Sequence, residues 1–143
     1  MYCTKIGFYK GNGSFFNLLV KLFTFSKISH CAIITRLSSN YACGYSSIPG
    51  EGVTYFETEY DKNDWEFFDL SIPRLDIFSF FSKTQDCLYD YCGCINCVIK
   101  FHQHKSRYFC SEWCAELLKL EKPENYTPSK LYRYFKNKDK QNA

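Results

Sequence analysis

The sequence has no run of the roughly 18 apolar residues that a transmembrane helix needs. Its longest apolar stretch, residues 15–25, is interrupted by Asn17 and Lys21. We expect no leader segment before the first predicted strand, because residues 1–10 already have the pattern of folded structure. We therefore expect no membrane span and a cytoplasmic location, which is the host cytoplasm if the protein is viral.

A strong excess of charge of one sign is also missing. The 143 residues carry 18 Lys and Arg against 15 Asp and Glu, a net charge of +3. This modest balance does not indicate a nucleic-acid partner. Hydrophobic residues make up 45% of the chain and aromatic residues 20%, which excludes disorder. We expect one domain over residues 1–135 and a solvent-exposed basic tail over 136–143.

Nine cysteines are present, an odd number, and without a leader segment they favour free thiols in a reducing compartment. One group has partial metal-ligand spacing: Cys87, Cys92, Cys94, Cys97, His102 and His104. Structural zinc sites typically show two C-x-x-C or similar knuckles, whereas only Cys94 and Cys97 form one here. We expect these thiols to pack between helices and to bind no metal. A zinc-stabilised interaction module over residues 87–104 is the alternative.

The periodicity of apolar residues predicts strands in the first half of the chain and helices mainly in the second. The predicted strands are 5–9, 30–35, 41–45, 52–58 and 65–70. Predicted helices follow Ser14, cover 77–83 and 86–101, follow Cys110, and cover 129–134. Short turns between the strands of residues 30–70 indicate an antiparallel meander. The sequence thus predicts an α+β fold with a small central antiparallel sheet flanked by helices.

Cys110 stands at the start of a predicted helix. From Ser111 onward the apolar positions recur at helical spacing: Trp113, Cys114, Leu117, Leu118 and Leu120. The positive end of the helix dipole favours a thiolate, and backbone N–H groups there can bind a developing oxyanion. We therefore interpret Cys110 as a nucleophile. Cys114 is the competing thiol, but it falls on the apolar face, where a buried thiol is inert packing.

A cysteine nucleophile needs a base, and the chain has three histidines. His30 begins a predicted strand, whereas His102 and His104 lie in a polar connector. Catalytic groups are held better on rigid elements than on connectors. The prediction is therefore a Cys110–His30 pair.

Several segments together resemble circularly permuted NlpC-type, papain-like proteins. These segments are Gly13–Phe23 followed by Thr24–Ile33, then Gly52-Val53, Tyr89–Tyr91 with Gly93, Phe109–Glu112, and Tyr126–Tyr132. They occur in the family's order and span most of residues 5–135. The resemblance implies a papain-like site in which His30 is the general base and Cys110 the nucleophile. The family includes peptidases and amidases, lecithin:retinol acyltransferase-like enzymes, and phage and poxvirus proteins.

The sequence departs from this family at the third polar position. Such proteins usually carry a Glu or His on the strand after the histidine, whereas residues 40–47 contain neither. Glu57, one strand later, is the nearest carboxylate on a predicted strand. We take it as the candidate that orients His30, with a solvent-facing strand residue as the alternative.

The function expected is a cysteine hydrolase that cleaves a peptide, amide or acyl-ester substrate through an acyl-thioester, with no metal or organic cofactor. One alternative is an acyltransferase or lipid-deacylating enzyme that uses the same residues. An aromatic groove would favour it, built from Phe15, Phe16, Phe78, Phe80 and Phe81. A non-catalytic viral or phage binding protein is another alternative, favoured by the missing third polar residue.

Overall fold

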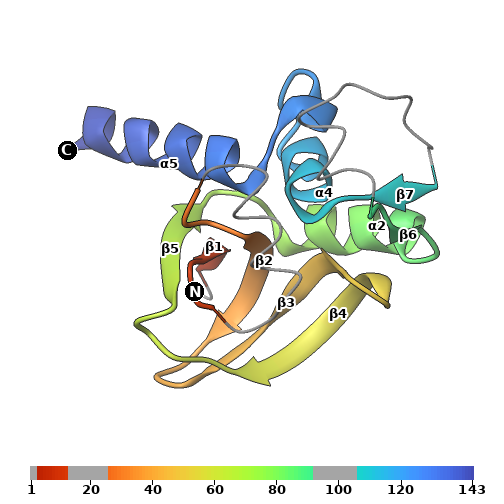
Figure 1. The fold of residues 1–143 in the computed structure, drawn as a ribbon, viewed down its shortest axis with the longest axis horizontal. Helices are drawn as coiled ribbons and strands as arrows, with labels where there is room; N and C mark the ends of the chain where they lie inside the picture. The colour runs from red at the N-terminus through yellow and green to blue at the C-terminus, as the bar shows by residue number, and fades with distance from the viewer. Residues whose placement is uncertain (1–2, 13–25, 92–105) are drawn as a thin grey trace.

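A computed structural model of the chain describes residues 3–12, 26–91 and 106–143, and it confirms the α+β class (Figure 1). The strands are β1 (Thr4–Tyr9), β2 (His30–Leu37), β3 (Tyr41–Ile48), β4 (Gly52–Glu59), β5 (Trp65–Leu70), β6 (Leu88–Tyr89) and β7 (Arg107–Tyr108). The helices are α2 (Arg74–Thr84), α4 (Cys110–Leu117), the 3-10 helix η1 (Pro123–Asn125) and α5 (Pro128–Asn142). The helix predicted after Ser14 lies outside the described residues.

The main sheet is antiparallel and has the strand order β4-β3-β2-β1-β5. Strands β2, β3 and β4 form the predicted meander, since each pairs with the next along the chain. Strand β5 does not continue it. Instead it crosses to the far edge of the sheet and pairs with β1, so that Tyr9 has His30 on one side and Trp65 on the other. The central strands β1 and β2 therefore carry the residues around which the rest packs.

Side chains alternate between the two faces of this sheet, as the pleat of a strand requires. The larger apolar core forms on the face that carries Ile6 and Phe8 of β1 with Cys31 and Ile33 of β2. A smaller cluster forms on the other face around Ala32 and Ile34. The larger core marks the face that the helices cover.

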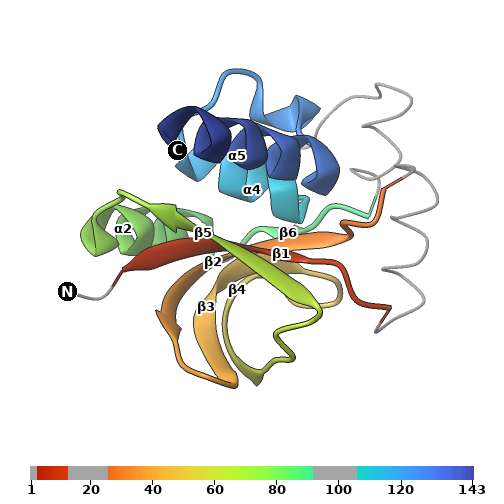
Figure 2. The ribbon, with the colours of Figure 1, turned by 90° about the vertical axis from the view of Figure 1, so that its left-hand side faces the viewer.

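Helices α4 and α5 lie on the same side of the sheet (Figure 2). Trp113 of α4 and Leu131 and Phe135 of α5 join the larger core. The indole N–H of Trp113 donates to the hydroxyl of Thr84 at 2.9 Å, which ties α4 to the end of α2. Burial of these apolar side chains, each worth about 1.5–3 kcal/mol, fixes α4 and α5 above the sheet.

The helix predicted over residues 86–101 is wrong over its described part. Leu88 and Tyr89 form strand β6, which pairs in parallel with β7. The segment is extended because the carbonyl of Cys87 accepts from the N–H of Val53 at 3.0 Å, and the N–H of Leu88 donates to Ser106 at 2.9 Å. Tertiary hydrogen bonds to β4 and to residue 106 thus replace local helix bonds here.

The last helix is longer than predicted. Thr127 caps it by accepting a hydrogen bond from the N–H of Lys130 at 3.0 Å, and the helix continues to Asn142. It therefore runs through the expected boundary between domain and tail. Lys136 forms an ion pair of 2.5 Å with Glu66 of β5, so the first residue of the expected tail packs on the sheet. None of the helices within the described ranges is long and apolar enough to cross a membrane.

Candidate thiol active site

Cys110 is the first residue of helix α4, as predicted from the sequence. Phe109 precedes it as the N-cap in an extended conformation, and its carbonyl accepts the first helical bond from the N–H of Trp113 at 3.0 Å. The N–H groups of the first helical turn have no acceptor in the preceding turn of the helix. Cys110 is therefore placed where the positive end of the helix dipole favours a thiolate.

His30 is the first residue of strand β2, also as predicted. Strand β2 packs directly beneath α4, as Figures 1 and 2 illustrate. His30 is only partly buried. Its ring lies edge-on to the indole of Trp65, with the ring centres 6.5 Å apart. Trp65 begins β5 on the far side of β1, so sheet pairing fixes the position of both rings.

Cys110 and His30 lie near each other, and the imidazole and charge of His30 help to lower the pKa of the thiol. Burial by itself raises the pKa of Cys110. Hydrogen bonds from the Cys31 thiol and His30, the charge of His30 and the backbone N–H of Cys31 outweigh burial, so that the pKa of Cys110 lies well below its usual value. This arrangement favours the thiolate form of Cys110.

Cys114 differs from Cys110 in its surroundings. It lies one turn further along α4, is fully buried in the core, and accepts a hydrogen bond from the thiol of Cys31 at 3.8 Å. The pKa of Cys31 is raised well above its usual value by burial and by its two thiol neighbours. Cys110 itself has 0% exposed surface, so a substrate must displace neighbouring groups to reach it from the partly exposed His30.

Two buried serines of β3 hold both halves of the site. The hydroxyl of Ser46 donates to the carbonyl of Cys31 at 2.8 Å, next to His30. The hydroxyl of Ser47 donates to the carbonyl of Tyr108 at 2.7 Å, two residues before Cys110. Sequence reasoning considered residues 40–47 only for an acid or a histidine and missed these roles. Two adjacent serines in an apolar strand were the available signal, since a buried hydroxyl needs a partner.

The segment around Tyr89 fixes the entry to α4 from the other side. The N–H of Asp90 donates to the carbonyl of Tyr108 at 3.0 Å, and the ring of Tyr89 packs on Phe109 with centres 5.7 Å apart. The carbonyl of Tyr108 therefore accepts from both Asp90 and Ser47. The Tyr-Asp-Tyr motif thus begins at the end of strand β6 rather than in a helix, and it positions the segment that ends at Cys110.

Glu112 closes the first turn of α4. Its carboxylate accepts a hydrogen bond from the backbone N–H of Phe109, which is one half of a capping box. Burial, opposed by this bond and assisted by the nearby carboxylates of Asp90 and Glu116, raises the pKa of Glu112 to about 7. The group therefore titrates near neutral pH, two residues from the candidate nucleophile.

Glu57 is not brought to His30, and its predicted orienting role is wrong. The register places Glu57 beside Cys43, and Cys43 beside Arg36. Arg36 lies six residues along β2 from His30, about 20 Å at roughly 3.3 Å per residue. Instead, Glu57 accepts hydrogen bonds from Tyr55 at 2.6 Å and Tyr41 at 3.2 Å.

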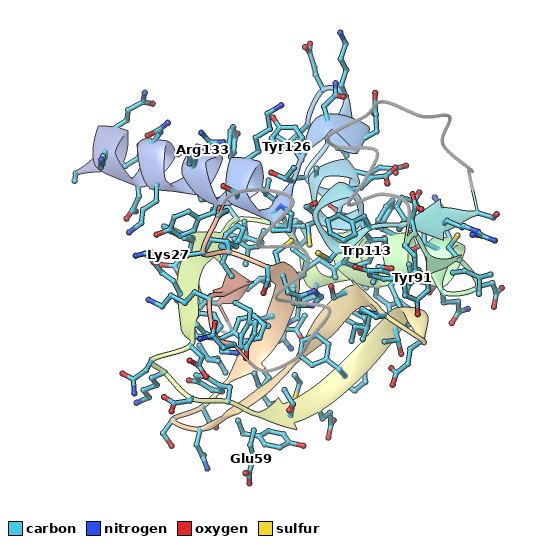
Figure 3. The ribbon with its side chains drawn as sticks, viewed as in Figure 1. Lys27, Glu59, Tyr91, Trp113, Tyr126 and Arg133 are labelled. Atoms are coloured by element: carbon cyan, nitrogen blue, oxygen red, sulfur yellow. The ribbon has the colours of Figure 1, made fainter. Side chains whose placement is uncertain are left out.

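The view with side chains shows where strand β4 ends. Glu59, the last residue of β4, lies at the lower edge of the molecule, whereas Trp113 of α4 lies nearer its middle (Figure 3). The position of Glu57 relative to His30 could not be predicted from the sequence alone. The direction of β4 and the pairing register decide which end of the strand lies near the helix. The glutamate is a surface residue of the sheet.

The remaining candidates lie outside the described residues: His102, His104, Cys92, Cys94, Cys97, Phe15 and Phe16. The described cysteines are all free thiols, namely Cys3, Cys31, Cys43, Cys87, Cys110 and Cys114. In the described part of the chain, no group of three or more His, Cys, Asp or Glu side chains has the geometry of a metal site.

Comparison of the sequence with protein-family models and with curated proteins finds no match in either set. The arrangement of residues described above is therefore the basis of the functional assignment.

Proposed function

We propose that this protein is a cysteine hydrolase of papain-like type, in which Cys110 is the nucleophile and His30 the general base and acid. The observation that carries the proposal is the placement of His30, at the start of β2, near a thiol at the start of the overlying helix α4 whose pKa is held well below its usual value. Perturbed thiols at helix N-termini beside a histidine are typical of thiol enzymes. The substrate class we propose is an amide, peptide or acyl ester.

In the proposed reaction the thiolate of Cys110 attacks the carbonyl carbon of the substrate. The backbone N–H of Cys110 donates to the developing oxyanion. His30 then gives its proton to the leaving amine or alcohol, which leaves an acyl-thioester on Cys110. Water then attacks the thioester with His30 as base. This step releases the carboxylic acid product and regenerates the free thiol of Cys110.

Trp65 takes a supporting role in this mechanism. Its edge-on contact limits the rotation of the His30 ring, a task that a third polar residue has in many thiol enzymes. Ser46 and Ser47 support the site by fixing the backbone beside each reacting residue. Free thiols throughout the described cysteines suit a reducing compartment, and we propose the cytoplasm.

An activity-based thiol probe tests the proposal. We expect the probe to label wild-type protein, to fail on Cys110→Ala, and to label Cys114→Ala, which is the matched control one turn along the same helix. Labelling that persists in Cys110→Ala but disappears in Cys114→Ala would mean that Cys114, and not Cys110, is the nucleophile. No labelling of folded wild-type protein would favour a non-catalytic binding protein.

Hydrolysis is preferred to acyl transfer because two of the aromatic residues considered for an acyl groove, Phe80 and Phe81, have other contacts. Phe80 packs on Trp113 with centres 5.4 Å apart, and Phe81 packs on Tyr45 at 4.6 Å. Both rings are committed to packing between α2 and the rest of the fold. Transfer of the acyl group from Cys110 to an added alcohol or amine, faster than to water, would reverse this preference.

A further inference from the structure

Three thiols meet beneath the start of helix α4. Cys110 and Cys114 are one turn apart on the face of α4 that packs against the sheet. Cys31 of β2 faces both of them: its thiol donates to Cys114 at 3.8 Å, and the thiol of Cys110 lies close enough to help raise the pKa of Cys31. All three residues have 0% exposed surface. A strand cysteine thus lies beside the candidate nucleophile and in contact with a second helix cysteine.

We propose that Cys31 and Cys110 form a peroxide-sensitive thiol pair, in which oxidised Cys110 is captured by Cys31 as a disulfide. The proposal deepens the proposed function, because its consequence for activity rests on Cys110 being the nucleophile. The modification itself requires only the two sulfur atoms and an oxidant. The oxidant that we propose is hydrogen peroxide. It is small enough to reach the buried thiol of Cys110, which larger reagents reach slowly.

The chemistry takes two steps. The thiolate of Cys110 attacks one oxygen of hydrogen peroxide, so that an S–O bond forms, the O–O bond breaks and hydroxide leaves. Sulfur loses two electrons and the peroxide is reduced. The thiol of Cys31 then attacks the sulfenic sulfur, so that an S–S bond forms, the S–O bond breaks and water departs with the Cys31 proton. A dithiol reductant reverses the product.

The surroundings of the three thiols decide the order of events. Peroxide reacts with thiolates rather than thiols. Cys110 has His30 and the helix start to stabilise its thiolate, whereas burial keeps Cys31 protonated. Cys114 does not compete as the capturing thiol on geometric grounds. Helical neighbours four residues apart have Cβ atoms about 5–6 Å from each other, and a disulfide needs about 3.5–4.5 Å.

Peptide mapping of the full chain tests this pair. Reduced protein is treated with hydrogen peroxide, the remaining thiols are blocked under denaturing conditions, and trypsin with a glutamate-specific protease follows. Glu112 lies between Cys110 and Cys114, so cleavage there separates the two helix cysteines. We expect peptide 28–36, which carries Cys31, to be linked to the peptide that ends at Glu112.

Two variants make the assignment specific. Cys114→Ala should keep the cross-link. Cys31→Ala should lose it and instead accumulate Cys110 with two or three added oxygens, which a dithiol does not reverse. Thermal unfolding establishes that each variant is folded. If Cys31→Ala does not fold, the wild-type and Cys114→Ala maps decide by themselves.

The results separate this inference from the proposed hydrolase. A Cys31–Cys114 link with Cys110 unmodified, or irreversible oxidation of Cys110 in wild type, would overturn the switch even if the thiol probe labels Cys110. A reversible Cys31–Cys110 link in a protein that the probe never labels would support the oxidation site and count against the hydrolase. If probe labelling of Cys110 is lost when the Cys31–Cys110 disulfide forms and returns after treatment with a dithiol, the result supports both the oxidation site and the proposed hydrolase.

Discussion

The carbonyl oxygen of Tyr108 accepts a hydrogen bond of 2.7 Å from the buried hydroxyl of Ser47. This bond joins strand β3 to the residue that lies two positions before Cys110. The neighbouring Ser46 binds the carbonyl of Cys31, beside His30, at 2.8 Å. Adjacent residues of one strand thus hold both reacting groups, because their side chains reach the helix segment and the neighbouring strand.

Replacement of Ser47 by Ala should weaken the fold and the site together. The variant removes a buried hydrogen bond, and we expect a loss of about 1–3 kcal/mol in the free energy of unfolding. Denaturant unfolding measures this loss, and probe labelling of Cys110 should slow. Ser38→Ala is the control: its exposed hydroxyl bonds Tyr41 at 3.2 Å, and the change should stay within about 0.5 kcal/mol. Equal effects of the two variants would contradict the role of Ser47.

Replacement of Glu57 by Gln should leave Cys110 unaffected. The carboxylate binds Tyr41 and Tyr55 on the surface of the sheet, far from His30 along the strands. We expect the rate of alkylation of Cys110 to match wild type at each pH, while the pKa of Tyr55, raised mainly by its bond to Glu57, falls. A slowing comparable with that of His30→Ala would mean that the carboxylate acts on the site.

Replacement of Gly52 by Ala should be much more harmful than replacement of Gly50. Both glycines have positive φ, 76° and 82°, so a side chain at either costs about 1–2 kcal/mol. At Gly52 an added Cβ would also lie 2.4 Å from the carbonyl oxygen of Cys87, whereas at Gly50 it meets nothing within 4 Å. We expect a further loss of about 1–3 kcal/mol for Gly52→Ala in denaturant unfolding. Equal losses would contradict the packing of residues 87–88 against β4.

Glu112 should make the protein less stable as the pH rises from about 4.5 to about 7. Its pKa is raised to about 7 in the folded state, mainly by burial, so the folded state binds the proton more tightly than the unfolded state. The free energy of unfolding therefore falls with pH across that window, and the cost of the charged form is fully present above it. Glu112→Gln, which keeps an acceptor for the N–H of Phe109, should flatten this part of the stability–pH profile. An unchanged slope would contradict the assignment.

The sequence correctly predicted which secondary-structure element begins at each of the two candidate catalytic residues. His30 begins a strand rich in β-branched residues, and Cys110 precedes an amphipathic helix, so local pattern alone located both. Residues 86–91 followed tertiary hydrogen bonds instead, which no local pattern encodes. Their helical appearance was therefore misleading.

Long-range pairing explains the other differences. Strand β5 pairs with β1 at the far edge, and this choice brings Trp65 to His30. The direction of β4 carries Glu57 away from the site. Pairing order and register depend on contacts between distant residues, so the third position near His30 could not be identified from one sequence.

The pH dependence of alkylation of Cys110 tests the Cys110–His30 pair most directly. The rate constant for iodoacetamide should follow the thiolate fraction, with a midpoint well below the free-cysteine value of about 8.5. In His30→Ala, which lacks the imidazole, the midpoint should move up toward that value, while Glu57→Gln stays with wild type. A wild-type midpoint at or above about 8.5, unchanged in His30→Ala, would contradict the account.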